Sequence, residues 1–192
     1  SVPADNAQAL IAYAKKNPDK LSYASSGNGA SSHLAGILFN KMAGTQIMHI
    51  PYKGTGPALN DLLGGQVSMS FTDILTALPY IKAGKLRAIG LASAQRSDAL
   101  PDLPTLSEQG LKGYDVSVFF GIVAPKDTPA AVTAKLNQAF QTALADPAIE
   151  QTLRSQGIVR AEDQTPQGLS AFIATEVPKW RTLIQSAHVS ID

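Results

Sequence analysis

Residues 20–44 of the chain, KLSYASSGNGASSHLAGILFNKMAG, join a short apolar run to a glycine- and serine-rich turn and then to a helical pattern. The run at 20–25 is typical of a strand. Leu34, Leu38 and Met42 recur at every fourth position, which predicts a helix that ends at Gly44. A strand, turn and helix of this kind can cradle an anion, bind a nucleotide or simply form a well-capped loop.

The same alternation continues along the next 50 residues. Further strands are predicted at 46–52, at 66–73, where apolar and polar residues alternate, and at 86–93. Helices are predicted between them, at 56–65 and 77–84. Alternating strands and helices with short connections predict an α/β fold with a mostly parallel sheet flanked by helices. Ligands of such sheets usually bind at the strand ends that lead into helices.

The remaining third of the chain has a different character. A long apolar strand is predicted at 116–125, and three later helices each have a capping residue followed by proline: Thr128 and Pro129, Asp146 and Pro147, Thr165 and Pro166. The last helix, at about 166–187, contains Pro178, where a bend is expected, and Trp180, expected to anchor it in a core. Amphipathic helices without a sheet of their own need a surface to cover, either in the first part of the chain or elsewhere in a larger protein.

Composition excludes several classes of function. The 192 residues contain 16 basic and 15 acidic side chains, a balance that gives no support to nucleic-acid binding. No apolar run is long enough to span a bilayer, so membrane insertion is not expected. There is no cysteine, which excludes disulfides, thiolate catalysis and cysteine-ligated metals.

The glycine-rich turn lacks two features of a dinucleotide site. The third glycine of that fingerprint is replaced by Ser32, and no Asp or Glu occurs between Lys20 and Asn60 to bind a ribose. No cofactor is therefore predicted. The acid-free span instead favours a small carboxylate, because its two strand-to-helix turns direct backbone N–H groups and helix dipoles at one crevice. The alternative is that glycine only permits the turn and serine only caps the helix.

Other candidate residues have structural alternatives. Serines with His33, His49 and Asp73 could form a hydrolase site, although the Gly-x-Ser-x-Gly elbow is missing. The two histidines have no supporting carboxylate between them, so no metal site is predicted. His33 is expected to donate a hydrogen bond near the helix start, and His49 to be a satisfied core residue. Lys53 is either a site residue or a solvated charge, and Asp73 either a site residue or a helix cap.

Taken in order, four segments resemble one family. They are residues 21–44 and the segments HIPYKGTGPALNDLLGGQVSMSF (49–71), LPYIKAGKLRAIGLASAQRSDALPDLPTLSEQGL (78–111) and FFGIVAPKDTP (119–129). The chain resembles the substrate-binding receptors of tripartite tricarboxylate transporters, the Bug family. The resemblance implies a periplasmic two-lobed receptor of the type II periplasmic-binding-protein architecture. It implies a second ligand-binding lobe at 1–117, and a crossover strand and helices of an incomplete first lobe at 118–192. The family's N-terminal portion, with its signal peptide, is expected to be missing.

The resemblance also implies a function and a set of ligand contacts. The expected function is a non-enzymatic receptor that captures a small carboxylate and delivers it to the membrane permease subunits of the transporter. Many members have Asp after the strand Phe, where this chain has Thr72 followed by Asp73. Two other classes remain open, a Ser/His hydrolase and a folded interaction module or domain-swapped homodimer. The predicted ligand-binding residues are Ser26, Gly27, Asn28, Gly29, Ser31, Ser32, His33, Lys53, Thr72 and Asp73.

Overall fold

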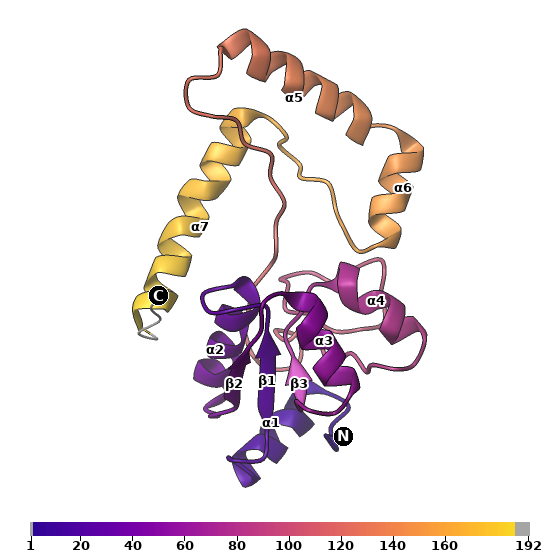
Figure 1. The fold of residues 1–192 in the computed structure, drawn as a ribbon, viewed down its shortest axis with the longest axis vertical. Coiled ribbons are helices and arrows are strands. Elements are labelled where there is room, and N and C mark those ends of the chain that lie inside the picture. The colour runs from indigo at the N-terminus through magenta and orange to yellow at the C-terminus, as the bar shows by residue number, and fades with distance from the viewer. Residues whose placement is uncertain (1, 187–192) are drawn as a thin grey trace.

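The computed structural model describes residues 2–186, which form three strands and seven helices (Figure 1). The first part of the chain contains α1 (Ala7–Lys16), β1 (Ser22–Ser25), α2 (Ser31–Ala43), β2 (Met48–Pro51), α3 (Thr55–Leu63), β3 (Met69–Ser70) and α4 (Ile74–Lys82). The second part contains α5 (Ala130–Leu144), α6 (Pro147–Ser155) and α7 (Pro166–Ser186). Among the described helices, none combines the length and the apolarity that a bilayer crossing requires.

The sheet is parallel and has the strand order β2-β1-β3, which confirms the predicted α/β class. Tyr23 of the central strand is paired with His49 on one side and with Met69 on the other. β3 is much shorter than predicted, with only two residues in the ladder. Because β1 lies in the middle, the turn that follows it is flanked by the turns that follow β2 and β3.

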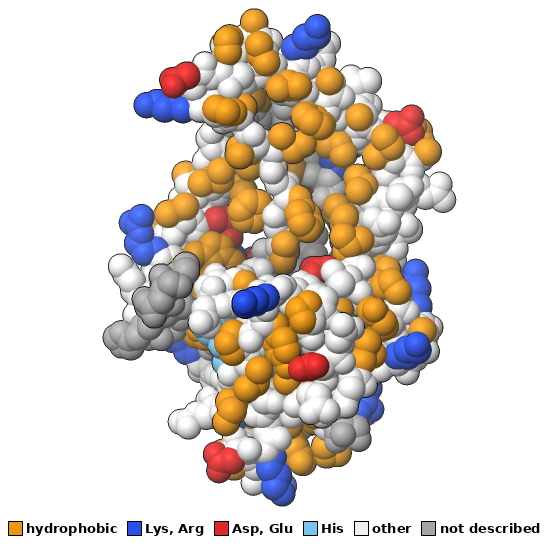
Figure 2. Space-filling model, in the orientation of Figure 1, with side chains coloured by type: hydrophobic (Ala, Val, Ile, Leu, Met, Phe, Trp, Pro, Cys, Tyr) orange, Lys and Arg blue, Asp and Glu red, His pale blue; other side chains and the backbone are white. Residues whose placement is uncertain are grey.

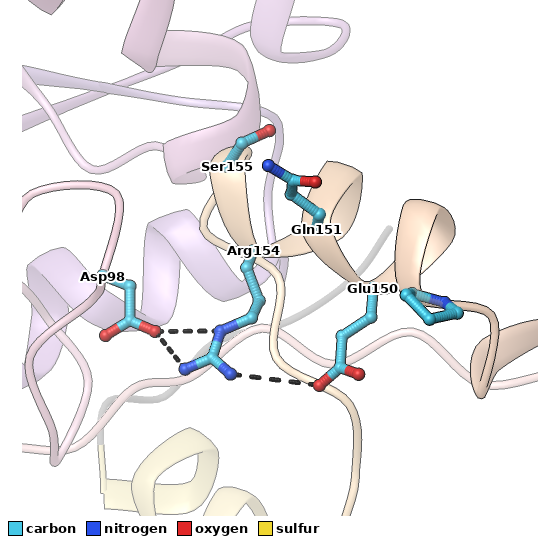
Figure 3. Close-up of a pocket in the computed structure, with 6 residues that line it drawn as sticks. Asp98, Glu150, Gln151, Arg154 and Ser155 are labelled. Carbon is cyan, nitrogen blue, oxygen red and sulfur yellow. Dashed lines mark hydrogen bonds and ion pairs between the residues drawn. The ribbon is translucent and has the colours of Figure 1, made fainter.

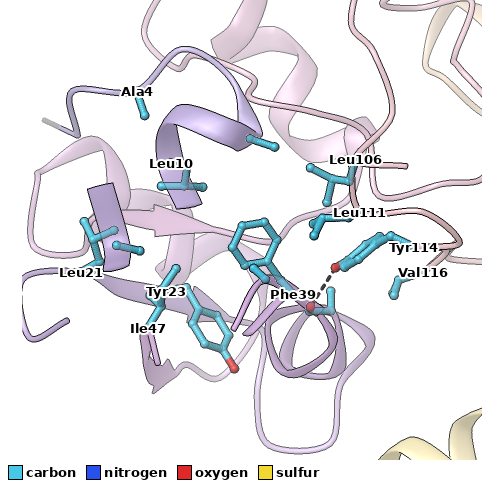
Figure 4. Close-up of a cluster of buried hydrophobic side chains, with 14 residues drawn as sticks. Ala4, Leu10, Leu21, Tyr23, Phe39, Ile47, Leu106, Leu111, Tyr114 and Val116 are labelled. Carbon is cyan, nitrogen blue, oxygen red and sulfur yellow. Dashed lines mark hydrogen bonds between the residues drawn. The ribbon is translucent and has the colours of Figure 1, made fainter. Parts of the chain in front are cut away.

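The main core joins α1, α2 and the sheet to the segment around residues 106–116 (Figure 4). Tyr23, Phe39 and Tyr114 are its largest buried side chains. The Tyr114 hydroxyl donates a hydrogen bond of 2.7 Å to the carbonyl of Ala35 in α2. This bond satisfies a buried phenol and fixes the returning chain against the helix.

Two predicted strands are absent from the described structure. Residues 86–93 form only an isolated bridge between Leu91 and Thr105, and the Ala92 carbonyl accepts from the Val116 N–H at 2.8 Å. The predicted strand at 116–125 joins no sheet among residues 2–186, and Phe120 and Val123 are 73% and 81% exposed. Apolar sequence alone does not make a strand, because a ladder also needs a neighbouring backbone.

The three C-terminal helices form an open arch above the sheet (Figure 1). Asp146 caps α6 as predicted, and the Thr165 hydroxyl accepts from Gly168 N–H at the start of α7. α5 begins one residue later than expected, with Pro129 in the cap position. α7 continues through Pro178, and Trp180 packs against the main core as expected. The end predicted at residue 187 lies outside the described residues.

Much of the apolar surface of the arch is exposed (Figure 2). The exposed side chains lie in the connecting segment, α5, the 149–159 region and α7: Val118, Phe119, Phe120, Ile122, Val123, Val132, Leu136, Phe140, Ile149, Val159, Phe172, Ile173 and Val177. In the described part of α5 and α6, no residue is buried. The arch therefore lacks the cover that amphipathic helices usually have.

Candidate functional site

The three parallel strands end at the same edge of the sheet, and each leads through a short loop into a helix. The loop at 26–30 leads from β1 into α2, the loop at 52–54 leads from β2 into α3, and the loop at 71–73 leads from β3 into α4. Because the strands are parallel, all three helix N-termini lie at this edge. Their dipoles and first N–H groups make it a place for negative charge.

Two of these three N-termini have no side-chain cap in the described structure. Ala30 occupies the cap position of α2 and Gly54 that of α3, whereas the Asp73 carboxylate accepts from Thr76 N–H and caps α4. The alternative in which serine caps the second helix is therefore wrong. Ser32 Oγ accepts instead from the Ser26 N–H at 2.9 Å. The N-termini of α2 and α3 are left available to an external anion.

Backbone contacts hold the first two loops together. The Tyr52 N–H donates to the Ser25 carbonyl at 3.1 Å, and the Gly54 N–H donates to the Ser26 carbonyl at 3.0 Å. Gly27 has φ of +141°, and a Cβ there would lie 3.3 Å from the Tyr52 carbonyl oxygen. Glycine is therefore needed at 27 both for the backbone angle and for the close approach.

His33 and His49 support the same loop, residues 26–30, through hydrogen bonds. Ser25 Oγ lies 2.6 Å from His49 Nε2 and accepts from the Gly27 N–H at 3.2 Å. The Gly29 N–H donates to His33 Nδ1 at 3.1 Å, so His33 accepts a hydrogen bond where a donor was predicted. The prediction that His49 is a satisfied residue agrees with its bond to Ser25.

Ser25 is a residue of the candidate site that the sequence analysis missed. It is fully buried at the end of β1 and links His49 to Gly27. Nothing in its local sequence separates it from the other serines, because its partner comes from a neighbouring strand. The parallel pairing of β1 and β2, once predicted, was the signal that could have brought the two residues together.

The Ser25–His49 pair lacks the properties of a hydrolase centre. Ser25 is closed to solvent, and Asp73, the acid considered for a triad, is engaged by Thr76 at the start of α4. Burial, and secondarily the neighbouring His33, lowers the pKa of His49 to about 4. Such a histidine is a poor general base near neutral pH, and among residues 2–186 no carboxylate orients its ring. Among the described residues, no group of three potential metal ligands is found.

The other predicted residues lie at the same edge with different exposure. Asn28 and Lys53 are exposed, and Ser26, Gly29, Ser31 and Ser32 are partly buried. Thr72 Oγ1 is buried and has no hydrogen-bond partner within the described residues. Asp61, the first acid after the acid-free span, accepts a hydrogen bond of 2.7 Å from the Tyr52 hydroxyl. This bond ties the second loop to α3.

A separate hollow of about 500 Å³ lies between α6 and the turn that contains Asp98 (Figure 3). Arg154 crosses it, with Nη2 2.6 Å from Asp98 and Nη1 3.9 Å from Glu150. Both partners of the shorter pair are more than half exposed. This hollow contains none of the predicted ligand residues, and its two carboxylates and one guanidinium leave it with a formal negative charge, which does not suit an anion.

Comparison with known proteins identifies the family. A family model described as the tripartite tricarboxylate transporter family receptor matches residues 1–189. BugT of Bordetella pertussis is 35% identical over 190 residues, covering 97% of this chain and 57% of BugT. A Pseudomonas protein of strain P51 is 37% identical over 188 residues, covering 95% of this chain and 56% of the relative. The chain therefore spans little more than half the length of these two relatives.

Solved structures share the same fold. The periplasmic binding protein BugD has a TM-score of 0.87 and 40% identity, over 98% of this chain and 63% of BugD. An R. palustris protein solved with adipate has a TM-score of 0.93 and 30% identity, over 99% of this chain and 63% of that protein. MatC of Rhodopseudomonas palustris, with bound malate, has a TM-score of 0.85 and 31% identity, over 96% of this chain and 63% of MatC. With the family model matching almost all of its length, the chain belongs to the tripartite tricarboxylate transporter receptor family.

Proposed function

We propose that this chain forms the carboxylate-receiving side of a solute-binding receptor. The observation that carries the proposal is the pair of helix N-termini, α2 and α3, that meet without side-chain caps at the edge of an acid-free sheet. Backbone N–H groups there are donors of fixed position, and a carboxylate accepts several such donors at once. Two structural relatives have adipate and malate bound, which supports the same ligand class for this chain.

The proposal includes a division of the chain and a mode of action. Residues 1–117 form the second ligand-binding lobe, and residues 118–192 are the crossover segment and helices of the first lobe. The exposed apolar surface of the arch supports this division, because a lobe that is only partly present has surface left to cover. The ligand is enclosed between the lobes when they close.

The proposed receptor is not an enzyme, acts in the periplasm and delivers its ligand to the permease subunits of a tripartite tricarboxylate transporter. The family description and the periplasmic relative BugD support this assignment. The predicted contacts beyond the backbone are the side chains of Ser26, Asn28, Ser31, Ser32, Lys53 and Thr72, and His33, predicted with them, lies against the same loop through its bond to Gly29. Asp73 has a second role as the cap of α4.

Calorimetric titration tests the proposal. The chain alone, and the chain joined behind the N-terminal portion of BugT, are titrated with adipate, malate and the neutral diamide of adipate. Binding of a dicarboxylate and not of the diamide, by the joined receptor, is the expected result. Absence of heat with a broad panel of mono-, di- and tricarboxylates in both proteins would reject the proposal.

A pair of glycine variants localises the site. Gly27→Ala strains the loop at the sheet edge, where φ is +141°, and is expected to weaken dicarboxylate binding. Gly65→Ala imposes a similar backbone penalty at φ of +74°, beyond the C-terminal end of α3, and has open space around it. Equal loss of affinity in both variants would point to general destabilisation and not to a site at the loop.

A further inference from the structure

The imidazole rings of His33 and His49 stack on each other next to the loop at 26–30. The ring centroids of His33 and His49 are 3.9 Å apart with an interplanar angle of 9°, and the Tyr23 ring stacks against His49 with centroids 4.9 Å apart. The Tyr23 hydroxyl also donates to the His33 carbonyl at 3.4 Å. The stack connects the central strand, the neighbouring strand and the first turn of α2.

Each imidazole supports a different glycine of the loop. His49 acts through Ser25, whose Oγ accepts from the Gly27 N–H. His33 acts directly, because its Nδ1 accepts from the Gly29 N–H. These two bonds fix the glycines on either side of Asn28, immediately before the uncapped N-terminus of α2.

The two contacts respond differently to a proton. A serine hydroxyl can donate or accept, so Ser25 and His49 remain hydrogen-bonded whether or not His49 Nε2 carries a proton. A backbone N–H can only donate, so the Gly29 contact requires a bare Nδ1 on His33. Neutral His33 therefore carries its proton on Nε2, and a second proton on Nδ1 would place two donors face to face.

The surroundings give little support to a charged imidazole. Burial lowers the pKa of His33, and a charge on either stacked ring disfavours a charge on the other. β1 contributes only the neutral Tyr23 to the stack. On α7, which packs against α2, Lys179 pairs with Glu176 and Asp115, and Arg181 is exposed. In the described chain, neither imidazole forms an ion pair with a carboxylate.

We propose that His33 is a positioning residue whose neutral form holds Gly29 in the anion-receiving loop, and that protonation of His33 releases this loop. Resting on the proposed function, the inference is that acid weakens carboxylate binding. If His33 instead contacts the carboxylate as a cation, the affinity for the carboxylate should rise in acid, because the protonated ring attracts the negative charge. The direction of the pH dependence therefore separates a positioning role from a direct charge contact.

Nuclear magnetic resonance of the labelled chain between pH 8 and pH 4 gives the first test. The Gly29 amide signal is expected to shift with the same midpoint as the ring nitrogens of His33, whose Nδ1 is bare at the upper end of the range. If the Gly29 amide signal does not shift as His33 titrates, the inference is wrong. This arm needs no ligand, so its result does not depend on whether any carboxylate of the panel binds, and the loop inference and the proposed function can fail separately.

Adipate affinity across the same pH range gives the second test, with the form of the receptor that binds it. Loss of one hydrogen bond is expected to lower affinity by about fivefold to tenfold as His33 protonates. The carboxyl groups of adipate also protonate in the lower part of this range and weaken binding in every variant. His33→Asn, whose Oδ1 can take the place of Nδ1, should retain binding and show only this loss from the ligand, whereas His33→Leu should weaken binding at every pH. His49→Gln is the matched control and should keep the acid loss. Affinity that rises on acidification, or a His33→Asn variant that behaves like His33→Leu, contradicts the inference.

Discussion

Gly36 of α2 lies directly against the ring of Tyr23 in β1: a Cβ on Gly36 would be 2.2 Å from Cε2 and Cζ of the tyrosine. Tyr23 is 2% exposed and cannot swing into solvent without leaving the core. The absence of a side chain at 36 therefore lets the helix approach the central strand.

Gly36→Ala is expected to lower the free energy of unfolding by about 1–3 kcal/mol, because overpacking outweighs the better helix propensity of alanine. Urea denaturation measures this difference. Gly56→Ala in α3 is the control, since a Cβ there meets nothing within 4 Å, and it should be neutral or stabilising. A Gly36→Ala variant as stable as the wild type would show that the ring relaxes freely.

Alkaline pH should destabilise the fold through the buried tyrosines. Burial raises the pKa of Tyr23 to about 12 and that of Tyr114 further. An unfolded tyrosine ionises near pH 10, so the stabilising contribution is complete below pH 10 and is lost as pH rises toward 12. Unfolding experiments at pH 8 to 11.5 should show falling stability, and Tyr23→Phe should reduce the slope. Ionisation of all five tyrosines near pH 10 in the folded protein would contradict this expectation.

Acid pH should destabilise the fold through His49. Its folded pKa of about 4 lies below the unfolded value near 6.5, so its contribution is present above pH 6.5 and is lost as pH falls toward 4. Because the ring is partly exposed, we expect a loss of about 1–2 kcal/mol after allowance for solvent screening. His49→Gln keeps a polar atom near the position of Nε2 and should flatten the pH dependence of urea unfolding. An equally steep curve in this variant would assign the acid loss to other groups.

The uncovered connecting segment should cause the chain to self-associate. Phe120 and Val123 are mostly exposed, and a contiguous apolar surface of this kind favours association. Phe120→Lys with Val123→Lys is expected to shift the chain toward monomer in sedimentation velocity experiments. Gln138→Lys with Gln167→Lys adds the same charge at exposed polar positions and should leave association unchanged. A wild-type chain that stays monomeric at high concentration would contradict this prediction and the domain-swapped homodimer.

Local signals in the sequence predicted many of the turns and helix ends in both parts of the chain. The turn after β1, the end of α2 at Gly44 and the cap of α6 at Asp146 each depend on residues within one helical turn. The predicted helix at 77–84 starts earlier in the structure, at Ile74, because Asp73 caps it. The capping alternative for Asp73 had been identified from the sequence, although the position of the helix start had not.

The features that escaped prediction are those that depend on distant partners. Ser25 differs from the serines around it only because His49 of the adjacent strand lies beside it. His33 is an acceptor because the loop folds back until Gly29 faces its ring. Residues 116–125 have the composition of a strand, but no backbone neighbour among the described residues completes a ladder. Pairing, loop closure and missing partners are properties of the assembled chain and leave no local signature.

The uncapped starts of α2 and α3 have a consequence for which substitutions the proposed carboxylate site tolerates. Their donors belong to the main chain, so substitution of exposed residues such as Asn28 and Lys53 leaves attraction for a carboxylate group in place. Under the proposed function, the side chains around the edge, and with them the shape of the acid that fits, can therefore differ while the main-chain donors for the carboxylate group stay in place.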